Sequence, residues 1–108
     1  MKNVVLKASL LVLVLGLVVP GYLMAADSGA QLFASKCAMC HGKEGAANTG
    51  MAKAMKLQPL SSPDVQKQSD AELKTTIEKG KGKMPAYGSK LSSTQIDDLV
   101  KYIRSLKK

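Results

Sequence analysis

The string CAMCH at residues 37–41 sets two thiols and an imidazole within five consecutive positions. A Cys-x-x-Cys-His spacing can hold a metal ion, cycle between dithiol and disulfide, or carry a covalently attached haem. Each use demands a different fold around the string. The rest of the sequence is therefore needed to distinguish the three uses.

A metal site, a redox-active dithiol and a plain structural disulfide all fit the rest of the chain poorly. A structural zinc site takes four ligands, usually as two separated pairs, and the chain has no further cysteine or histidine. A thioredoxin-like dithiol lies at the start of a helix that follows a strand, and no strand pattern is present. A disulfide between cysteines this close would enclose a very short ring and add little stability.

Covalent haem attachment uses all three side chains. Cys37 and Cys40 would form thioethers to the two vinyl groups of one haem c, and His41 would bind the iron as an axial ligand. Such attachment takes place outside the cytoplasm, so an export signal should precede the string. The sequence therefore predicts one covalently attached haem c per chain.

The N-terminus has the pattern of an export signal. A positive start precedes the apolar run Ala8–Val19, which a Pro-Gly pair ends. We expect residues 1–25 to be a signal peptide, residues 26–108 to form the folded domain, and the protein to be periplasmic. The alternative is a retained membrane anchor, because no charge lies between Lys7 and Asp27, a distance close to a bilayer span.

Helical periodicity predicts short helices joined by long loops. One helix should cover residues 29–37, and a shorter one residues 51–57, whereas segment 58–68 shows no pattern and is expected to be irregular. Two later helices should each begin with a capping box, formed by Ser69 with Glu72 and by Ser92 with Gln95. We expect an all-α fold with three to five short helices.

An iron held by His41 needs a second axial ligand in a low-spin electron carrier, and a methionine thioether is suited to it. The candidates are Met39, Met51, Met55 and Met84. Met39 lies inside the string and should point away from the haem, and Met51 and Met55 read as ordinary core residues. Met84 precedes a proline in a glycine-rich loop, far enough along the chain to reach the other haem face. It is the predicted second ligand.

The string CAMCH, the segment GKMPAYG around Met84 and the two outer helices resemble the class I c-type cytochromes, especially small bacterial single-haem carriers of the c6 and c551 type. The resemblance implies a small cytochrome c fold over residues 26–108, wrapped around the haem. It also implies a helix crossing. Gly29 and Phe33 are expected on one side of that crossing, and Leu99 and Tyr102 on the other.

The resemblance departs from the family after the histidine, where a proline-containing loop normally offers a carbonyl to the second ring nitrogen. We expect the carbonyl of Pro59, or one beside it, to accept the hydrogen bond of His41 Nδ1 instead. Tyr87 is expected to pack near Met84.

The expected function is one-electron transfer between redox partners, without catalysis, as the iron cycles between Fe(II) and Fe(III). The alternative keeps the haem but leaves Met84 weakly bound, giving a peroxidase-like or gas-binding protein. A third hypothesis is a haem-bound interaction or sensor module.

Without residues 1–25, the chain keeps 14 of its 16 Lys and Arg and all 8 Asp and Glu, so its charge is about +6, which favours an acidic protein partner or a membrane surface. Lys79, Lys81 and Lys83 precede Met84 closely and should orient the haem toward an acidic redox protein, such as a membrane oxidoreductase or a terminal oxidase or reductase. Basic residues interleaved with aromatics are lacking, so nucleic acid is not an expected partner, and we expect a monomer.

Overall fold

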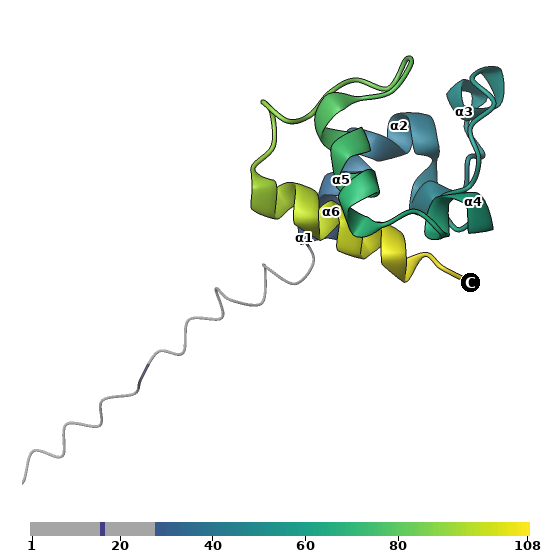
Figure 1. The fold of residues 1–108 in the computed structure, drawn as a ribbon. Helices are drawn as coiled ribbons and strands as arrows, with labels where there is room; N and C mark the ends of the chain where they lie inside the picture. The colour runs from purple at the N-terminus through teal and green to yellow at the C-terminus, as the bar shows by residue number, and fades with distance from the viewer. Residues whose placement is uncertain (1–15, 17–27) are drawn as a thin grey trace, which may run out of the picture.

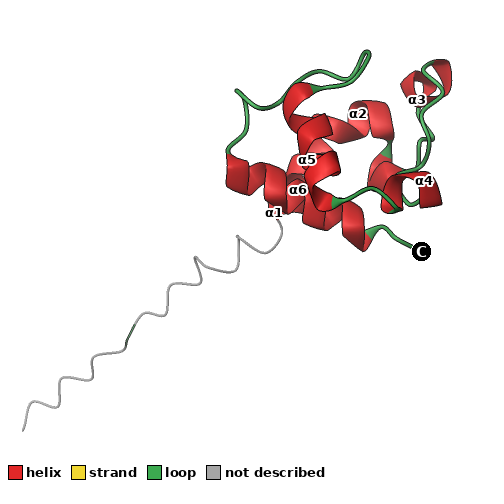
Figure 2. Ribbon diagram, in the orientation of Figure 1, coloured by secondary structure: helices red, strands yellow, loops and turns green. Residues whose placement is uncertain are grey.

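The structure, a computed structural model, describes Gly16 and residues 28–108. The predicted signal peptide, residues 1–25, lies outside this part of the chain apart from Gly16. Figure 1 and Figure 2 follow the elements in chain order: α1 (Ser28–Leu32), the π-helical turn η2 (Phe33–Cys37), α2 (Ala38–His41), the 3-10 turn η3 (Lys43–Gly45), α3 (Gly50–Ala54), α4 (Pro63–Gln66), α5 (Asp70–Lys79) and α6 (Ser93–Ser105).

Helices account for the regular structure of the described residues, which confirms the all-α class. The elements α1, η2 and α2 follow one another without a break and form one N-terminal helix, residues 28–41. With this helix counted once, the described chain holds five α-helical stretches, in agreement with the expected number. None of the helices in the described part is long and apolar enough to cross a membrane.

The N-terminal helix crosses α6, and α1 makes its most extensive contact there (Figure 1). Gly29 lies at the crossing, where an added Cβ would be 2.4 Å from the carbonyl oxygen of Asp98. Because glycine has no side chain, the two backbones can meet. The rings of Phe33 and Tyr102 pack beside this point with centroids 5.0 Å apart, and Leu99 belongs to the same buried cluster. The predicted helix crossing is confirmed.

Both predicted capping boxes are formed. The hydroxyls of Ser69 and Ser92 accept hydrogen bonds from the third backbone N–H of α5 and α6, and Glu72 and Gln95 accept from the cap residues in return. These reciprocal bonds satisfy backbone donors that would otherwise lack partners. Each helix then buries one face in the core, whose buried members are Phe33, Leu73, Ile77, Leu91, Ile96, Leu99, Val100 and Ile103.

The prediction of an irregular segment at 58–68 is wrong for four residues, because α4 forms there. Pro63 takes the first helical position, where its fixed φ and missing N–H are favourable. The Gln66 amide donates to the carbonyls of Leu60 (2.8 Å) and Ile103 (2.9 Å) and so ties α4 to α6. One of these acceptors lies far along the chain, so no local pattern could reveal it.

Candidate functional site

The N-terminal helix presents the CAMCH string at its C-terminal end. Its middle turn is π-helical, because the Ala38 N–H donates to the Phe33 carbonyl, five residues earlier. The string and the helix both end at His41, and the next residue, Gly42, turns the chain out of the helix with a φ of +81°. Cys37 and His41, four residues apart and therefore on one face, line a cavity. Cys40 is half-buried outside the lining of this cavity.

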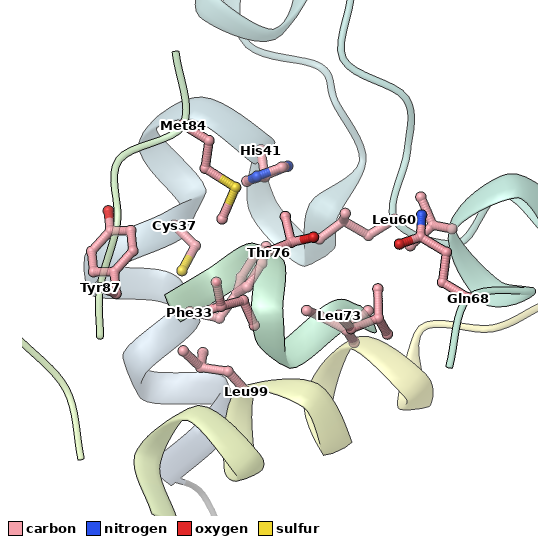
Figure 3. A pocket seen from close by; sticks show the side chains of 13 residues that line it. Phe33, Cys37, His41, Leu60, Gln68, Leu73, Thr76, Met84, Tyr87 and Leu99 are labelled. Atoms are coloured by element: carbon pink, nitrogen blue, oxygen red, sulfur yellow. The ribbon is translucent and has the colours of Figure 1, made fainter. Parts of the chain in front are cut away.

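Met84 belongs to the loop between α5 and α6, residues 80–92, which we call the Met84 loop. Lys81 and Met84 exchange two backbone hydrogen bonds of 3.2 and 2.9 Å across a tight turn. Gly80 permits this turn, because its φ is +75° and a Cβ there would be 2.5 Å from the Met84 carbonyl oxygen. The Met84 side chain is partly buried and extends over the cavity toward the His41 ring (Figure 3).

The cavity lies between the N-terminal helix, the Met84 loop, α5, α6 and the chain around α4 (Figure 3). Its lining residues are Phe33, Cys37, His41, Leu60, Val65, Gln68, Leu73, Thr76, Ile77, Met84, Tyr87, Leu99 and Ile103. Most of these side chains are aliphatic or aromatic, and none of these described residues carries a carboxylate or an ammonium group. The walls therefore suit a large apolar group, and the thiol, imidazole and thioether are available to bind it.

Burial governs the titration of the two reactive groups on the wall. It raises the pKa of the Cys37 thiol to about 11, with a smaller contribution from the nearby Cys40 thiolate charge. Burial lowers the pKa of His41, because a charged imidazolium would lose its hydration. His41 is therefore neutral at pH 7, and the neutral imidazole is the form that binds a metal.

The Nδ1 atom of His41 is buried and has no hydrogen-bond partner among the described residues. The bond expected from Nδ1 to the Pro59 carbonyl is not formed. That carbonyl accepts the Ser62 N–H at 3.0 Å, in the turn that precedes α4. A buried ring nitrogen without a partner is costly, by about 1–3 kcal/mol. Nδ1 is the nitrogen expected to face a backbone carbonyl, so the orientation of the His41 ring is not fixed by a hydrogen bond from this atom to any described residue.

Comparison with known proteins identifies the family. A family model described as cytochrome c oxidase, cbb3-type, subunit III matches residues 24–103. This chain is a small class I c-type cytochrome. It is 30% identical to cytochrome c6 of Gloeothece citriformis, with 95% of this chain and 93% of that protein covered. It is 36% identical to the cbb3-type cytochrome c oxidase subunit FixP of Azorhizobium caulinodans, over 81% of this chain and 29% of that subunit.

Solved structures agree with this assignment. The cytochrome matches the c-type cytochrome KustC0563 with a TM-score of 0.67 at 28% identity, covering 74% of this chain and 98% of the other. It matches cytochrome c6C from Synechococcus sp. PCC 7002 with a TM-score of 0.50 at 30% identity, covering 73% and 93% of the two chains. The predicted cytochrome c fold is confirmed.

The cytochrome carries one covalently bound haem c and belongs to the proteins of electron transport. The cavity fits this cofactor, because its walls are apolar and its donor atoms are the soft sulfur and neutral imidazole that haem iron accepts. The described residues contain no cluster of three or more His, Cys, Asp or Glu side chains that could hold a separate metal ion.

The other methionines occupy different surroundings. Met39 is 81% exposed, as expected for a side chain that points away from the cavity. The prediction of a core position for Met51 is wrong, because this side chain is 49% exposed on the outer helix α3. Met55 is partly buried but does not line the cavity. Of the methionines in the described chain, Met84 alone lines it.

Sequence reasoning missed residues that hold the string in place. The Thr49 hydroxyl donates to the Cys40 carbonyl at 2.7 Å and accepts from the Ala52 N–H at 2.9 Å, so it joins α2 to the start of α3. A threonine before a Gly-Met-Ala-Lys segment is an ordinary N-cap signal and could have been noticed. No sequence pattern indicated that Gln68 and Thr76 would line the cavity.

Proposed function

We propose that this cytochrome is an exported single-haem electron carrier in which Cys37 and Cys40 hold the haem through thioethers and His41 and Met84 bind its iron. The observation that carries the proposal is that His41 and Met84, from a helix and from a distant loop, line one apolar cavity beside Cys37. The bound haem supplies the chemistry, a one-electron change between Fe(III) and Fe(II). The protein holds both axial ligands and excludes water.

Each side chain has a distinct part in this proposal. Cys37 and Cys40, three residues apart, would hold the haem through thioethers, and His41 beside them would bind its iron. Met84, from the loop, would supply the second iron ligand. Thioether ligation favours ferrous iron, and the apolar wall does the same by disfavouring the additional charge of the ferric state.

Electron transfer without catalysis is the proposed activity, because the described residues that line the cavity offer no partner for acid-base chemistry. A peroxidatic site needs a polar group that can move a proton beside the iron. His41 is the sole histidine of the sequence. Among the described residues that line the cavity, Gln68, Thr76 and Tyr87 are the neutral polar ones, and none of these titrates near pH 7.

The proposed partner is an acidic redox protein, such as a membrane oxidoreductase or a terminal oxidase or reductase. Lys79, Lys81 and Lys83 are exposed on or next to the Met84 loop, and none of them forms an ion pair with another described residue. They are therefore free to attract carboxylates near the proposed ligand. The likeness to FixP, which is an oxidase subunit, supports a place beside a respiratory oxidase.

The proposal includes export to the periplasm. Residues 1–25 would act as the signal peptide, and residues 26–108 would form the cytochrome c domain, working as a monomer. If the apolar segment is retained, the same domain would be held at the membrane surface. Mass spectrometry of the protein from its own host decides between a chain that starts at residue 26 and a full-length one.

The test is a potentiometric titration followed by optical spectroscopy, on the haem-loaded wild type, Met84→Ala and the control Met51→Ala. We expect the wild type to titrate as one single-electron couple and to show the weak ferric band that reports sulfur bound to iron. Met84→Ala should keep the covalent haem, lose the band and have a lower reduction potential. The control should match the wild type, because Met51 lies outside the cavity.

A band that persists in Met84→Ala would refute the ligand assignment. A wild type that lacks the band and binds carbon monoxide readily would refute electron transfer as the main activity and favour the ligand-binding or peroxidatic alternative.

A further inference from the structure

The Met84 loop is tied mainly to the end of α5. The Tyr87 N–H donates to the Ile77 carbonyl at 2.9 Å, and the Gly88 N–H donates to the Glu78 carbonyl at 3.0 Å. These backbone bonds fix the loop on the side of the cavity that α5 forms. They do not hold the loop against the N-terminal helix, which carries the other proposed haem ligands.

Among the described residues, one hydrogen bond joins the Met84 loop to the N-terminal helix. The hydroxyl of Tyr87 donates to the carbonyl of Lys36 at 3.2 Å, across 51 positions of the sequence. Lys36 lies in the π-helical turn η2, immediately before Cys37. The bond therefore joins the turn that carries the first attachment cysteine to the loop that carries Met84.

Tyr87 is well placed to transmit this contact to Met84. It follows Met84 by three residues, and its ring lines the cavity beside Cys37 (Figure 3). Its own carbonyl accepts from the N–H groups of Lys90 and Leu91, and the Lys90 ammonium lies 5.7 Å from the ring centroid. The residue is held by its main chain on one side of the cavity and by its hydroxyl on the other.

We propose that Tyr87 is a positioning residue that clamps the Met84 loop onto the N-terminal helix through its bond to the Lys36 carbonyl, and so slows release of Met84 from the iron. The inference rests on the proposed function, because it takes Met84 as the axial ligand. For the loop to swing away from the cavity, the Tyr87 bond must break, whereas the bonds to α5 can remain. The clamp therefore controls how often the sixth position opens.

The experiment measures imidazole binding to the ferric, haem-loaded protein by stopped-flow absorption. When imidazole is in excess, its binding rate reaches a limit set by the opening of the loop. A neutral hydrogen bond of ordinary net strength corresponds to about a threefold to tenfold change in such an opening step. We expect the limiting rate in Tyr87→Phe to rise by this factor, with faster deuterium exchange of the amides of residues 80–92.

The matched control is Tyr102→Phe. Its hydroxyl makes no hydrogen bond among the described residues, and its ring packs on Phe33 at the helix crossing. This variant should bind imidazole at the wild-type limiting rate. A general structural role of Tyr87 would instead lower the urea midpoint of unfolding without changing the limiting rate in the absence of urea.

The outcomes separate this inference from the proposed function. If the wild type shows the sulfur-to-iron band and a saturating rate, but Tyr87→Phe behaves like Tyr102→Phe, the clamp is refuted and the ligand assignment stands. If the wild type lacks the band and its rate never saturates, Met84 is not a ligand and both proposals are overturned.

Discussion

The crossing of the N-terminal helix with α6 predicts a sharp sensitivity to one methyl group. In Gly29→Ala, the new Cβ would be 2.4 Å from the carbonyl oxygen and 3.0 Å from the carbonyl carbon of Asp98. Both are backbone atoms, which no side-chain rotation can move away. The helices would have to separate by about 1 Å to restore an ordinary contact, and the packing of Phe33 on Tyr102 would loosen with them.

The expected cost follows from two opposing effects. Overpacking of a close contact costs about 1–3 kcal/mol. Replacing glycine by alanine within a helix returns up to about 1 kcal/mol, because alanine loses less backbone entropy. We therefore expect Gly29→Ala to lower the free energy of unfolding by about 1–2 kcal/mol, which for a domain of this size lowers Tm by about 4–8 °C per kcal/mol.

Thermal and urea unfolding of the haem-loaded protein, followed by circular dichroism, measures this change. The control is Gly50→Ala at the start of α3, where an added Cβ meets nothing within 4 Å. This variant should be as stable as the wild type or more stable. If Gly29→Ala were no less stable than Gly50→Ala, the reasoning about the crossing would be wrong.

The remaining predictions concern backbone strain, capping and charge. Ala47 has a φ of +55°, so Ala47→Gly should raise the free energy of unfolding by up to about 1 kcal/mol, measured as a higher urea midpoint. A midpoint equal to that of Ala46→Gly, whose site has a φ of −72°, would contradict this. Ser92→Ala should cost about 1 kcal/mol in the same assay, because it removes the cap of α6, whereas an unchanged midpoint would mean that the cap adds nothing. Lys81→Gln should slow the reduction of the haem by an acidic partner and make the rate less dependent on salt, whereas Lys101→Gln on α6 should change neither. Equal effects of the two variants would argue that the lysines of the Met84 loop do not attract the partner.

Local chemistry explains what could be predicted of the fold. The capping boxes at Ser69 and Ser92 mark the starts of α5 and α6, because a cap and its partner lie three residues apart in the sequence. Gly80 ends α5 for a similarly local reason, a positive φ. The helix crossing at Gly29 came from the family resemblance, and the close backbone contact accounts for it physically.

The features that could not be predicted depend on distant partners. Helix α4 is secured by Gln66 through the Ile103 carbonyl, and Arg104 of α6 also donates to the Gln66 carbonyl at 2.8 Å. The exposure of Met51 follows from the outer position of α3, which its apolar side chain does not indicate. Likewise, the π-helical turn η2 (Phe33–Cys37) shifts the helical register by one residue, and no sequence pattern predicts it.

The candidate site residues could be selected from local sequence patterns, but their arrangement in space could not. The Cys-x-x-Cys-His spacing pointed to Cys37, Cys40 and His41, and the glycine-rich loop pointed to Met84, but the predicted helix ended at residue 37, whereas the N-terminal helix continues to His41. The meeting of His41 and Met84 at one cavity could not be derived from local pattern, because it depends on how the Met84 loop folds back on α5. The expected bond from His41 Nδ1 to the Pro59 carbonyl is absent, and that carbonyl instead accepts the Ser62 N–H in the turn before α4.

The most direct test of the central claim, axial ligation by His41 and Met84, is a proton NMR spectrum of the ferrous haem-loaded protein. The haem ring current shifts the methyl group of a bound methionine far upfield, as an isolated three-proton signal. We predict one such signal in the wild type and in Met51→Leu, and its loss in Met84→Leu. A wild type without the signal, or a signal that survives in Met84→Leu, would contradict the account.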